Sequence, residues 1–175
     1  MDEELLARLT SVYRDLHRHP GLSSQEHRIT AWLRDLGLEV LEGIGGTGVV
    51  GILRNGPGPT VALRADMDAL PVAEQVDLPF KSTATGTYEG KSVPVMHACG
   101  HDTHTAMLLA AAEILAGLRD RLPGKVVLLF RPAEEGGPAA EGIAGAERMI
   151  AEGALDEPKV DAVFGIHAFA GLESG

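Results

Sequence analysis

The sequence predicts an α/β fold, a layered sheet flanked by helices. Three observations lead to this class: helical periodicity over the first forty residues, two runs that are apolar nearly throughout, and an alternation of strand-like and helix-like segments after residue 48. Such alternation is typical of a sheet on which helices pack. With 175 residues the chain is long enough to bury a substantial core, so we expect one domain over residues 1–175.

The first forty residues predict two helices. Acidic residues 2–4 stand where the positive end of a helix dipole would lie, and apolar residues follow at helical spacing: Leu5, Leu9, Val12 and Leu16. This helix should end near residues 19–21. A second should run from Ser23, which forms a capping-box pattern with Glu26, to Gly37, with an apolar face made of Ile29, Trp32, Leu33 and Leu36.

The remaining chain predicts strands in four runs, a further strand before Cys99, and two further helices. Short β-rich runs, 48–53 and 60–66, flank a turn at residues 55–58. The runs 125–130 and 160–166 are apolar nearly throughout, which is expected of strands buried on both faces. Helical spacing recurs at 107–118 and from residue 146 to Gly153. The polar segment 72–92 carries no clear signal of its own.

Composition excludes several function classes. Fifteen basic and 25 acidic residues leave a formal net charge of −10, which disfavours nucleic acid and anionic membranes as partners. The single cysteine cannot form an internal disulfide, the N-terminus is acidic where a signal peptide would be basic, and no apolar run is long enough to span a bilayer. We therefore expect a reducing, cytoplasmic location.

Residues with metal-binding chemistry follow four of the expected strands. They are Asp66 and Asp68 at the end of the 60–66 run, the Cys99 cluster after the next expected strand, Glu134 and Glu135 after 125–130, and His167 just after 160–166. A lone carboxylate or histidine at a strand end is usually just solvated. Four together indicate a site, because ligands of open α/β sheets gather at the carboxyl ends of strands.

The residue types favour a divalent metal. Cys99 and His101 would project to the same face of an extended segment, and thiolate, imidazole and carboxylate together suit Zn²⁺, with Mn²⁺ or Co²⁺ also possible in two-metal sites. Glu134 and Glu135 would point in different directions on extended backbone. One could then bind metal while the other takes a proton from water, as metal-assisted hydrolysis requires.

Other polar residues leave alternatives open. Asp68 could orient a metal-bound histidine, since such histidines usually donate their other N–H to a carboxylate. His97, Asp102 and His104 are ambiguous, and Asp102 or Thr103 could instead cap the following helix. Two histidines, His17 and His19, are expected at the end of a surface helix without a partner.

A cysteine hydrolase is a further alternative, with Cys99 as nucleophile and His101 or His104 as its base. That hypothesis does not explain the glutamate pair or His167.

Five segments carry a family resemblance. In this order and spacing the chain resembles the N-terminal half of the amidohydrolase branch of the aminoacylase and carboxypeptidase metallopeptidases, which includes hippurate hydrolases, N-acyl-amino-acid amidohydrolases and auxin-conjugate hydrolases. The segments are "LHRHPGLSSQEHRIT", "LRADMDALPV", "MHACGHDTHTAMLLAAA", "LLFRPAEEGGPAAEGIAGAERMIAEGAL" and "VFGIHAF".

The resemblance implies roles for particular residues. It implies a zinc-peptidase-like mixed sheet, two divalent cations (Zn, Mn or Co), and hydrolysis of the amide bond of small N-acyl amino acids such as hippurate. Cys99 would be the bridging ligand, with His101, Glu135 and His167 as further ligands. The general base would be Glu134, and Asp68 would orient the site.

Members of this family are roughly twice as long. They carry a lid domain, which also forms the dimer surface, then the last catalytic strands and one more histidine ligand. We therefore expect residues 1–175 to be the N-terminal part of the catalytic domain, apparently truncated before the lid. The alternative to an amidohydrolase is a metal-binding fragment that does not turn over substrate.

Overall fold

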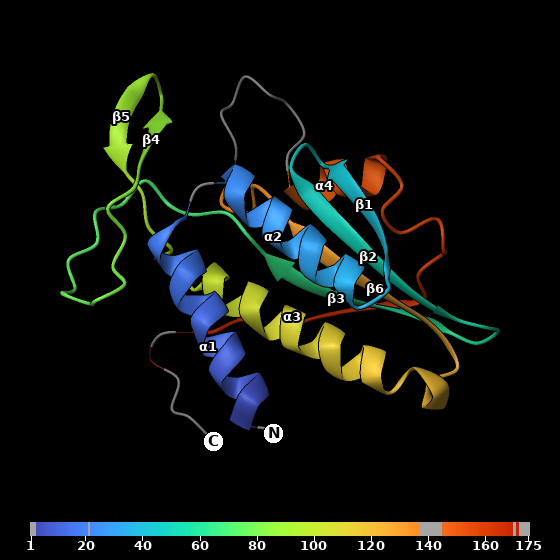
Figure 1. Ribbon diagram of the computed structural model, residues 1–175. Helices are drawn as coiled ribbons and strands as arrows, with labels where there is room; N and C mark the ends of the chain where they lie inside the picture. The colour runs from blue at the N-terminus through green and yellow to red at the C-terminus, as the bar shows by residue number, and fades with distance from the viewer. Residues whose placement is uncertain (1–2, 21, 137–144, 170, 172–175) are drawn as a thin grey trace.

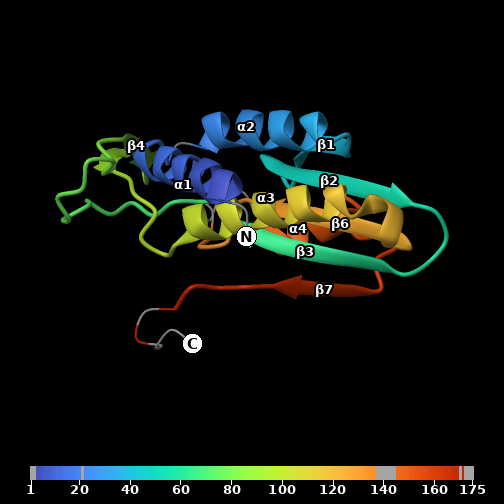
Figure 2. The same cartoon turned by 60° about the horizontal axis from the view of Figure 1, so that its bottom comes forward.

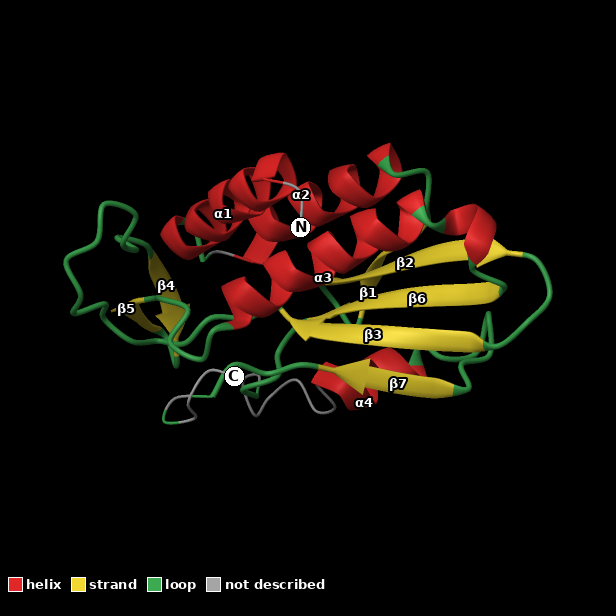
Figure 3. Cartoon of the chain, turned by 90° about the horizontal axis from the view of Figure 1, so that it is seen from below, coloured by secondary structure: helices red, strands yellow, loops and turns green. Residues whose placement is uncertain are grey.

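The computed structural model describes residues 3–20, 22–136, 145–169 and 171. A five-stranded mixed sheet forms its centre, in the order β1-β2-β6-β3-β7, and a separate hairpin, β4-β5, projects from one end (Figures 1 and 3). The main-sheet strands are β1 (Glu39–Ile44), β2 (Gly48–Asn55), β3 (Thr60–Asp66), β6 (Gly124–Arg131) and β7 (Ala162–Gly165). The hairpin consists of β4 (Thr85–Tyr88) and β5 (Lys91–Pro94). The predicted α/β class is thus confirmed.

Three helices cover one face of the sheet. They are α1 (Glu3–Arg18), α2 (Leu22–Asp35) and α3 (His101–Gly117), which lie together in Figure 3. The short helix α4 (Gly145–Ala151) packs on the opposite face, and one 3₁₀ turn, Arg119–Arg121, follows α3. These bounds confirm the predicted helical pair and the two later helices. Asp2 and the side chain of Ser23 lie outside the described residues, so the capping box stays a prediction.

Alternate residues of the central strands enter two different cores. Val49, Leu53 and Phe130 pack under α2 and α3, while their neighbours Val50 and Leu129 pack against Met149 of α4. This division follows from the period of two in a strand, which sends successive side chains to opposite faces. The sheet is therefore the middle layer of three, and its central strands are largely apolar because both faces are covered.

The strand order brings three carboxyl ends to one edge. β3 pairs parallel with β6, with Asp66 opposite Arg131, and β7 pairs parallel with β3. The order separates β2 from β3, although they are consecutive in sequence, and β6 lies between them. The residues that follow β3, β6 and β7 are consequently neighbours.

The expectation of two buried faces is wrong for the last strand. β7 is an edge strand that pairs with β3 alone in the described structure, and it lies at the margin in Figure 2. Val163 is 49% and Phe164 59% exposed, because no helix or strand of the described chain covers them. An apolar run fits an exposed edge as readily as a buried centre, so composition could not distinguish the two.

Candidate metal centre

His101, the first residue of α3, lies at the centre of the candidate site. Its side chain is 1% exposed, and its Nδ1 lies 2.9 Å from the backbone oxygen of Asp68 and 3.1 Å from Oδ1 of the same residue. Both neighbours are acceptors, so Nδ1 carries a proton and donates it. The other nitrogen, Nε2, is buried without a hydrogen-bond partner among the described residues.

Two glutamates face that unpartnered nitrogen. Oε2 of Glu134 lies 3.9 Å and Oε1 of Glu135 4.0 Å from Nε2 of His101. The predicted extended backbone here is wrong: the chain bends after Ala133, which has a φ of +50°, and both carboxylates reach the same atom. A bend brings two successive side chains together where an extended segment would separate them.

Contacts distinguish the two glutamates. Oε1 of Glu134 lies 3.1 Å from Nη2 of Arg131, which also donates from Nε to the buried carboxylate of Asp66 at 2.5 Å. Glu135 has a different restraint, because its backbone N–H donates to Oδ2 of Asp68 at 2.9 Å. Arg131 thus holds one glutamate and Asp68 the other.

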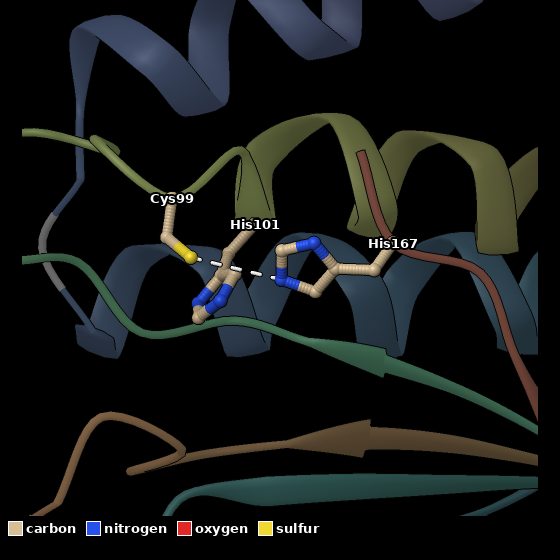
Figure 4. Close-up of side chains that lie close together, drawn as sticks. All are labelled: Cys99, His101 and His167. Atoms are coloured by element: carbon tan, nitrogen blue, oxygen red, sulfur yellow. Dashed lines mark hydrogen bonds between the residues drawn. The ribbon is translucent and has the colours of Figure 1, made fainter. Parts of the chain in front are cut away.

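Cys99 and His167 complete the cluster. Sγ of Cys99 lies 3.6 Å from Nε2 of His167, and Figure 4 shows both side chains converging beside His101. Nδ1 of His167 donates to the backbone oxygen of Ala168 at 2.6 Å, which leaves the lone pair of Nε2 directed at the thiol. His167 follows β7, as predicted, and is exposed.

The backbone around Cys99 differs from the prediction. β5, the strand before it, belongs to the separate hairpin rather than the main sheet, so Cys99 lies on a loop leading into α3. Gly100 has a φ of +79° and His101 is already helical, so the segment is not extended. Cys99 and His101 meet because a left-handed glycine turns the chain into the helix, a conformation that glycine adopts without steric cost.

Local charge sets the protonation of the cluster. Burial and the nearby carboxylates of Glu135 and Glu134 raise the pKa of Cys99 to about 11, so the thiol stays protonated at neutral pH. Burial lowers the pKa of His101, but Asp68 outweighs it and holds that pKa above the ordinary imidazole value. The carboxylates thus favour a positive charge at the centre of the site.

The donors fit a divalent cation. Ligand atoms of Cys99, His101 and His167 lie within 4.8 Å of one another, as do those of His101, Glu134 and Glu135. His101 belongs to both sets, and the single free lone pair of its buried Nε2 can bind one ion. Thiolate, imidazole and carboxylate are the ligands that Zn²⁺ and related ions take in proteins. The six predicted site residues, Asp68 included, therefore lie together.

A third group of acidic and histidine side chains is a weaker candidate. Ligand atoms of Asp66, His101 and His104 are equally close, but Asp66 is paired with Arg64 and Arg131. Nε2 of His104 accepts the backbone N–H of Ala168 at 2.8 Å, and burial lowers the pKa of His104 to about 4. His104 therefore stays neutral and supports the backbone that carries His167.

Two more ambiguous residues have structural contacts. His97 is buried, with its Nε2 2.7 Å from Nε2 of Gln25, and burial lowers its pKa to about 4. Asp102 is the second residue of α3 and not its cap, a position that Gly100 occupies without a side-chain hydrogen bond. The capping prediction for Asp102 or Thr103 is thus wrong.

Sequence reasoning missed two side chains. Arg131 orients Glu134, and its place at the strand end, three residues before that glutamate, was an available signal. His17 was expected on a surface without a partner, but it is buried between Glu74 and Asp102. Those partners are 57 and 85 residues away, so nothing local indicated them.

A three-layer α/β fold defines a metallohydrolase-like architecture when a glutamate pair and a histidine follow its strands and a cysteine and a second histidine lie at the start of a helix beside them. The family model of peptidase family M20/M25/M40 matches residues 62–175, and the chain belongs to this family. The predicted family resemblance is confirmed.

Curated relatives include several hydrolases. The chain is 47% identical over 173 residues to thermostable carboxypeptidase 1 of Saccharolobus solfataricus, covering 95% of this chain and 40% of the relative. It is 43% identical over 164 residues to N-acetyl-L-cysteine deacetylase of Bacillus subtilis, covering 91% of this chain and 36% of the relative. An IAA-amino acid hydrolase of Arabidopsis thaliana, ILR1-like 2, is 42% identical over 95% of this chain and 35% of its own length. The chain thus spans well under half the length of these relatives.

Solved structures agree with this relationship. A dinuclear metal-binding peptidase of the M20 family from Bacillus subtilis superposes with a TM-score of 0.82 at 38% identity, covering 98% of this chain and 45% of that one. A putative aminohydrolase from Staphylococcus aureus gives 0.84 at 37% identity, with 99% and 44% coverage. None of the helices in the described part combines the length and apolar character needed to cross a membrane.

Proposed function

We propose that this chain provides the metal-binding part of a metal-dependent amidohydrolase that cleaves the amide bond of small N-acyl amino acids, with hippurate as a representative substrate. The observation that carries the proposal is the convergence of Cys99, His167 and two glutamates on His101, whose Nε2 is buried and unpartnered among the described residues. Relatives named as a deacetylase and an amino acid hydrolase support the substrate class.

The contacts support a particular ligand set. Cys99, His101, Glu135 and His167 would hold two divalent cations (Zn, Mn or Co). Asp68 would keep the lone pair of His101 directed at the cations, because it accepts the Nδ1 proton, and would position Glu135 through its backbone N–H. When bound, the cations would polarise the amide carbonyl and make a water molecule more acidic.

Glu134 would serve as general base. Arg131 holds its Oε1, so Oε2 is the oxygen directed toward the site, at 3.9 Å from His101. A carboxylate restrained in this way can take a proton from the attacking water and return it to the leaving amine. This assigns the acid–base step to Glu134 and a ligand role to Glu135.

Further parts of the proposal concern the whole protein. Residues 1–175 would form the N-terminal part of the catalytic domain, and the lid, the last histidine ligand and the dimer surface would belong to a longer chain. The acidic composition and single cysteine support a cytoplasmic location without nucleic acid or membrane partners. A metal-binding chain without turnover is the competing candidate, because the chain spans only 40% of its carboxypeptidase relative.

The test measures metal content and turnover separately. The purified chain is loaded with Zn²⁺, Mn²⁺ or Co²⁺, the bound metal is counted, and hydrolysis of hippurate is followed. Glu134→Gln should keep the metal and lower turnover at least about 100-fold, since general-base catalysis contributes that much. Glu135→Gln should lose metal. Glu113→Gln, at an α3 glutamate paired with Arg8, is the control that should change neither.

The possible results separate the candidates. Bound metal without turnover in the unmodified chain would favour the non-catalytic alternative. Unchanged metal content in both Cys99→Ser and Glu135→Gln would refute the ligand assignment.

A further inference from the structure

A second cluster of charged groups lies beside the candidate metal centre, around His17 of α1. Its Nδ1 lies 2.6 Å from Oδ2 of Asp102, and its Nε2 lies 2.9 Å from Oε1 of Glu74. The imidazole is 8% exposed and each carboxylate 2%. The ring also packs edge-on against Phe80 and tilted against Tyr13, at centroid distances of 5.6 and 5.9 Å.

The geometry requires a protonated ring. Ionised carboxylates only accept hydrogen bonds, so an imidazole that contacts a carboxylate through each nitrogen must donate from both. Burial lowers the pKa of His17, but its hydrogen bonds to Glu74 and Asp102 and their charges outweigh burial and raise it. His17 is therefore an imidazolium between two buried carboxylates, where charge-assisted hydrogen bonds are strong.

The cluster connects three segments of the chain. His17 belongs to α1. Glu74 lies on the segment from β3 to α3, and its Oε2 also accepts the backbone N–H of Ser82 at 2.5 Å. The third partner, Asp102, directly follows His101 on α3, and its Oδ1 accepts the backbone N–H of Thr103 at 2.8 Å. The imidazolium thus ties α1 to the first turn of α3 and to the segment that carries Asp68 and Cys99.

Several contacts restrain the start of α3, and one of them reaches a neighbouring helix. Gly100, the residue before the helix, supplies no side-chain cap and has a left-handed backbone. Asp68 accepts from the His101 ring and the hydroxyl of Thr105 donates to the backbone oxygen of Asp66, so both bonds hold the helix to the end of β3. Among the described contacts, the His17–Asp102 bond joins the first turn of α3 to a neighbouring helix.

We propose that His17 is a positioning residue for the metal centre, holding the first turn of α3, through Asp102, where His101 meets Cys99 and the two glutamates. The inference rests on the ligand set of the proposed function. Among the described contacts, His17 itself touches none of the proposed metal ligands.

The experiment compares His17→Gln with two controls on the same helix. His19→Gln removes an exposed histidine that contacts only Asp15 among the described residues. Leu16→Ala removes a fully buried side chain next to His17 and lowers stability without touching the carboxylates. Glu74→Gln is a milder second variant, because it keeps the His17–Asp102 bond.

Two readouts are taken well below each unfolding temperature. Zn²⁺ is titrated against a chromophoric chelator, and the ring nitrogens of the histidines are followed by ¹⁵N NMR in metal-free protein. His17→Gln should raise the Zn²⁺ dissociation constant about 10-fold, the lower end of the effect of losing a partner behind a metal ligand. It should also shift the Nδ1–H signal of His101. His19→Gln and Leu16→Ala should change neither the Zn²⁺ dissociation constant nor the His101 signal, although Leu16→Ala lowers the unfolding temperature.

Each result decides a different question. If folded His17→Gln binds Zn²⁺ as tightly as the unmodified chain and its His101 signal does not move, the positioning role is overturned. The role is also overturned if Leu16→Ala changes both readouts as much as His17→Gln does, because the effect of His17 would then be purely structural. If the unmodified chain binds no Zn²⁺, the proposed ligand set fails, and the His101 signal alone then decides whether His17 positions that ring. A His17 ring with one unprotonated nitrogen at pH 6 would also refute the inference.

Discussion

Asp68 accepts the Nδ1 proton of buried His101 with two oxygens. The backbone oxygen of Asp68 lies 2.9 Å and its Oδ1 3.1 Å from Nδ1 of His101. This pair fixes the tautomer of the imidazole and leaves Nε2 facing the two glutamates. The orientation of His101 toward the glutamates thus depends on Asp68, which follows β3, whereas both glutamates follow β6.

Replacing Asp68 should weaken metal binding. In Asp68→Asn the side chain can still accept from His101, but its charge is lost, so the imidazole becomes a poorer ligand. We expect Zn²⁺ affinity to fall at least about 10-fold, as is usual for such partners of metal-bound histidines. Competition with a chromophoric chelator measures this. Asp77→Asn, at an exposed site paired with Lys81, serves as control, and equal losses in both would contradict the assignment.

The contribution of His17 to stability should depend on pH. Its folded pKa is raised, so its stabilisation is complete below the unfolded value of about 6.5 and is lost as the pH rises through the folded pKa. In urea unfolding of metal-free protein, the difference in free energy between the unmodified chain and His17→Gln should be large near pH 6 and shrink toward pH 9. A difference that is constant over this range would show that the charge of His17 is irrelevant.

Cys99 should react slowly with alkylating agents. Its pKa is raised to about 11, and the thiolate is the reactive form, so little of it is present at neutral pH. In metal-free folded protein, iodoacetamide should modify Cys99 more slowly than it modifies the unfolded chain at pH 8, and the rate should still be rising above pH 9. Fast modification at neutral pH would instead support the cysteine-hydrolase alternative.

Removing Arg131 should destabilise the edge of the sheet where the site lies. The carboxylate of Asp66 is buried, and Arg131→Met leaves Arg64 as its partner among the described guanidinium groups. Removing one partner of a buried ion pair lowers the free energy of unfolding by about 3 kcal/mol, because the other charge stays buried. The double variant Arg131→Met/Asp66→Asn should recover part of this loss. Arg34→Met, which breaks an exposed pair with Glu42, should cost less than about 1 kcal/mol. Chemical denaturation measures the free energy of unfolding of the unmodified chain and of the three variants.

Local pattern alone determined much of this fold. The helices α1 and α2, the strands β2, β3 and β6, and the helix α3 follow from periodicity, apolar runs and turn residues, which depend on neighbours in sequence. The chemistry of the site was also legible, because metal-binding side chains follow β3, β6 and β7. Strands β1 and β4 were missed, since short and partly exposed strands carry a weak apolar signal. The strand expected before Cys99 is β5, which lies in the separate hairpin.

Tertiary structure decided what depends on distant partners. The placement of β6 between β2 and β3 sets which strand ends meet, and it rests on pairings between residues as far apart as Val49 and Phe130. β7 has the composition of a central strand but lies at the edge of the sheet that the described residues form. His17 reads as a surface histidine, yet Glu74 and Asp102, far along the chain, bury it as a cation. A sequence pattern reports on a residue's neighbours in the chain, whereas burial and charge pairing depend on its neighbours in space.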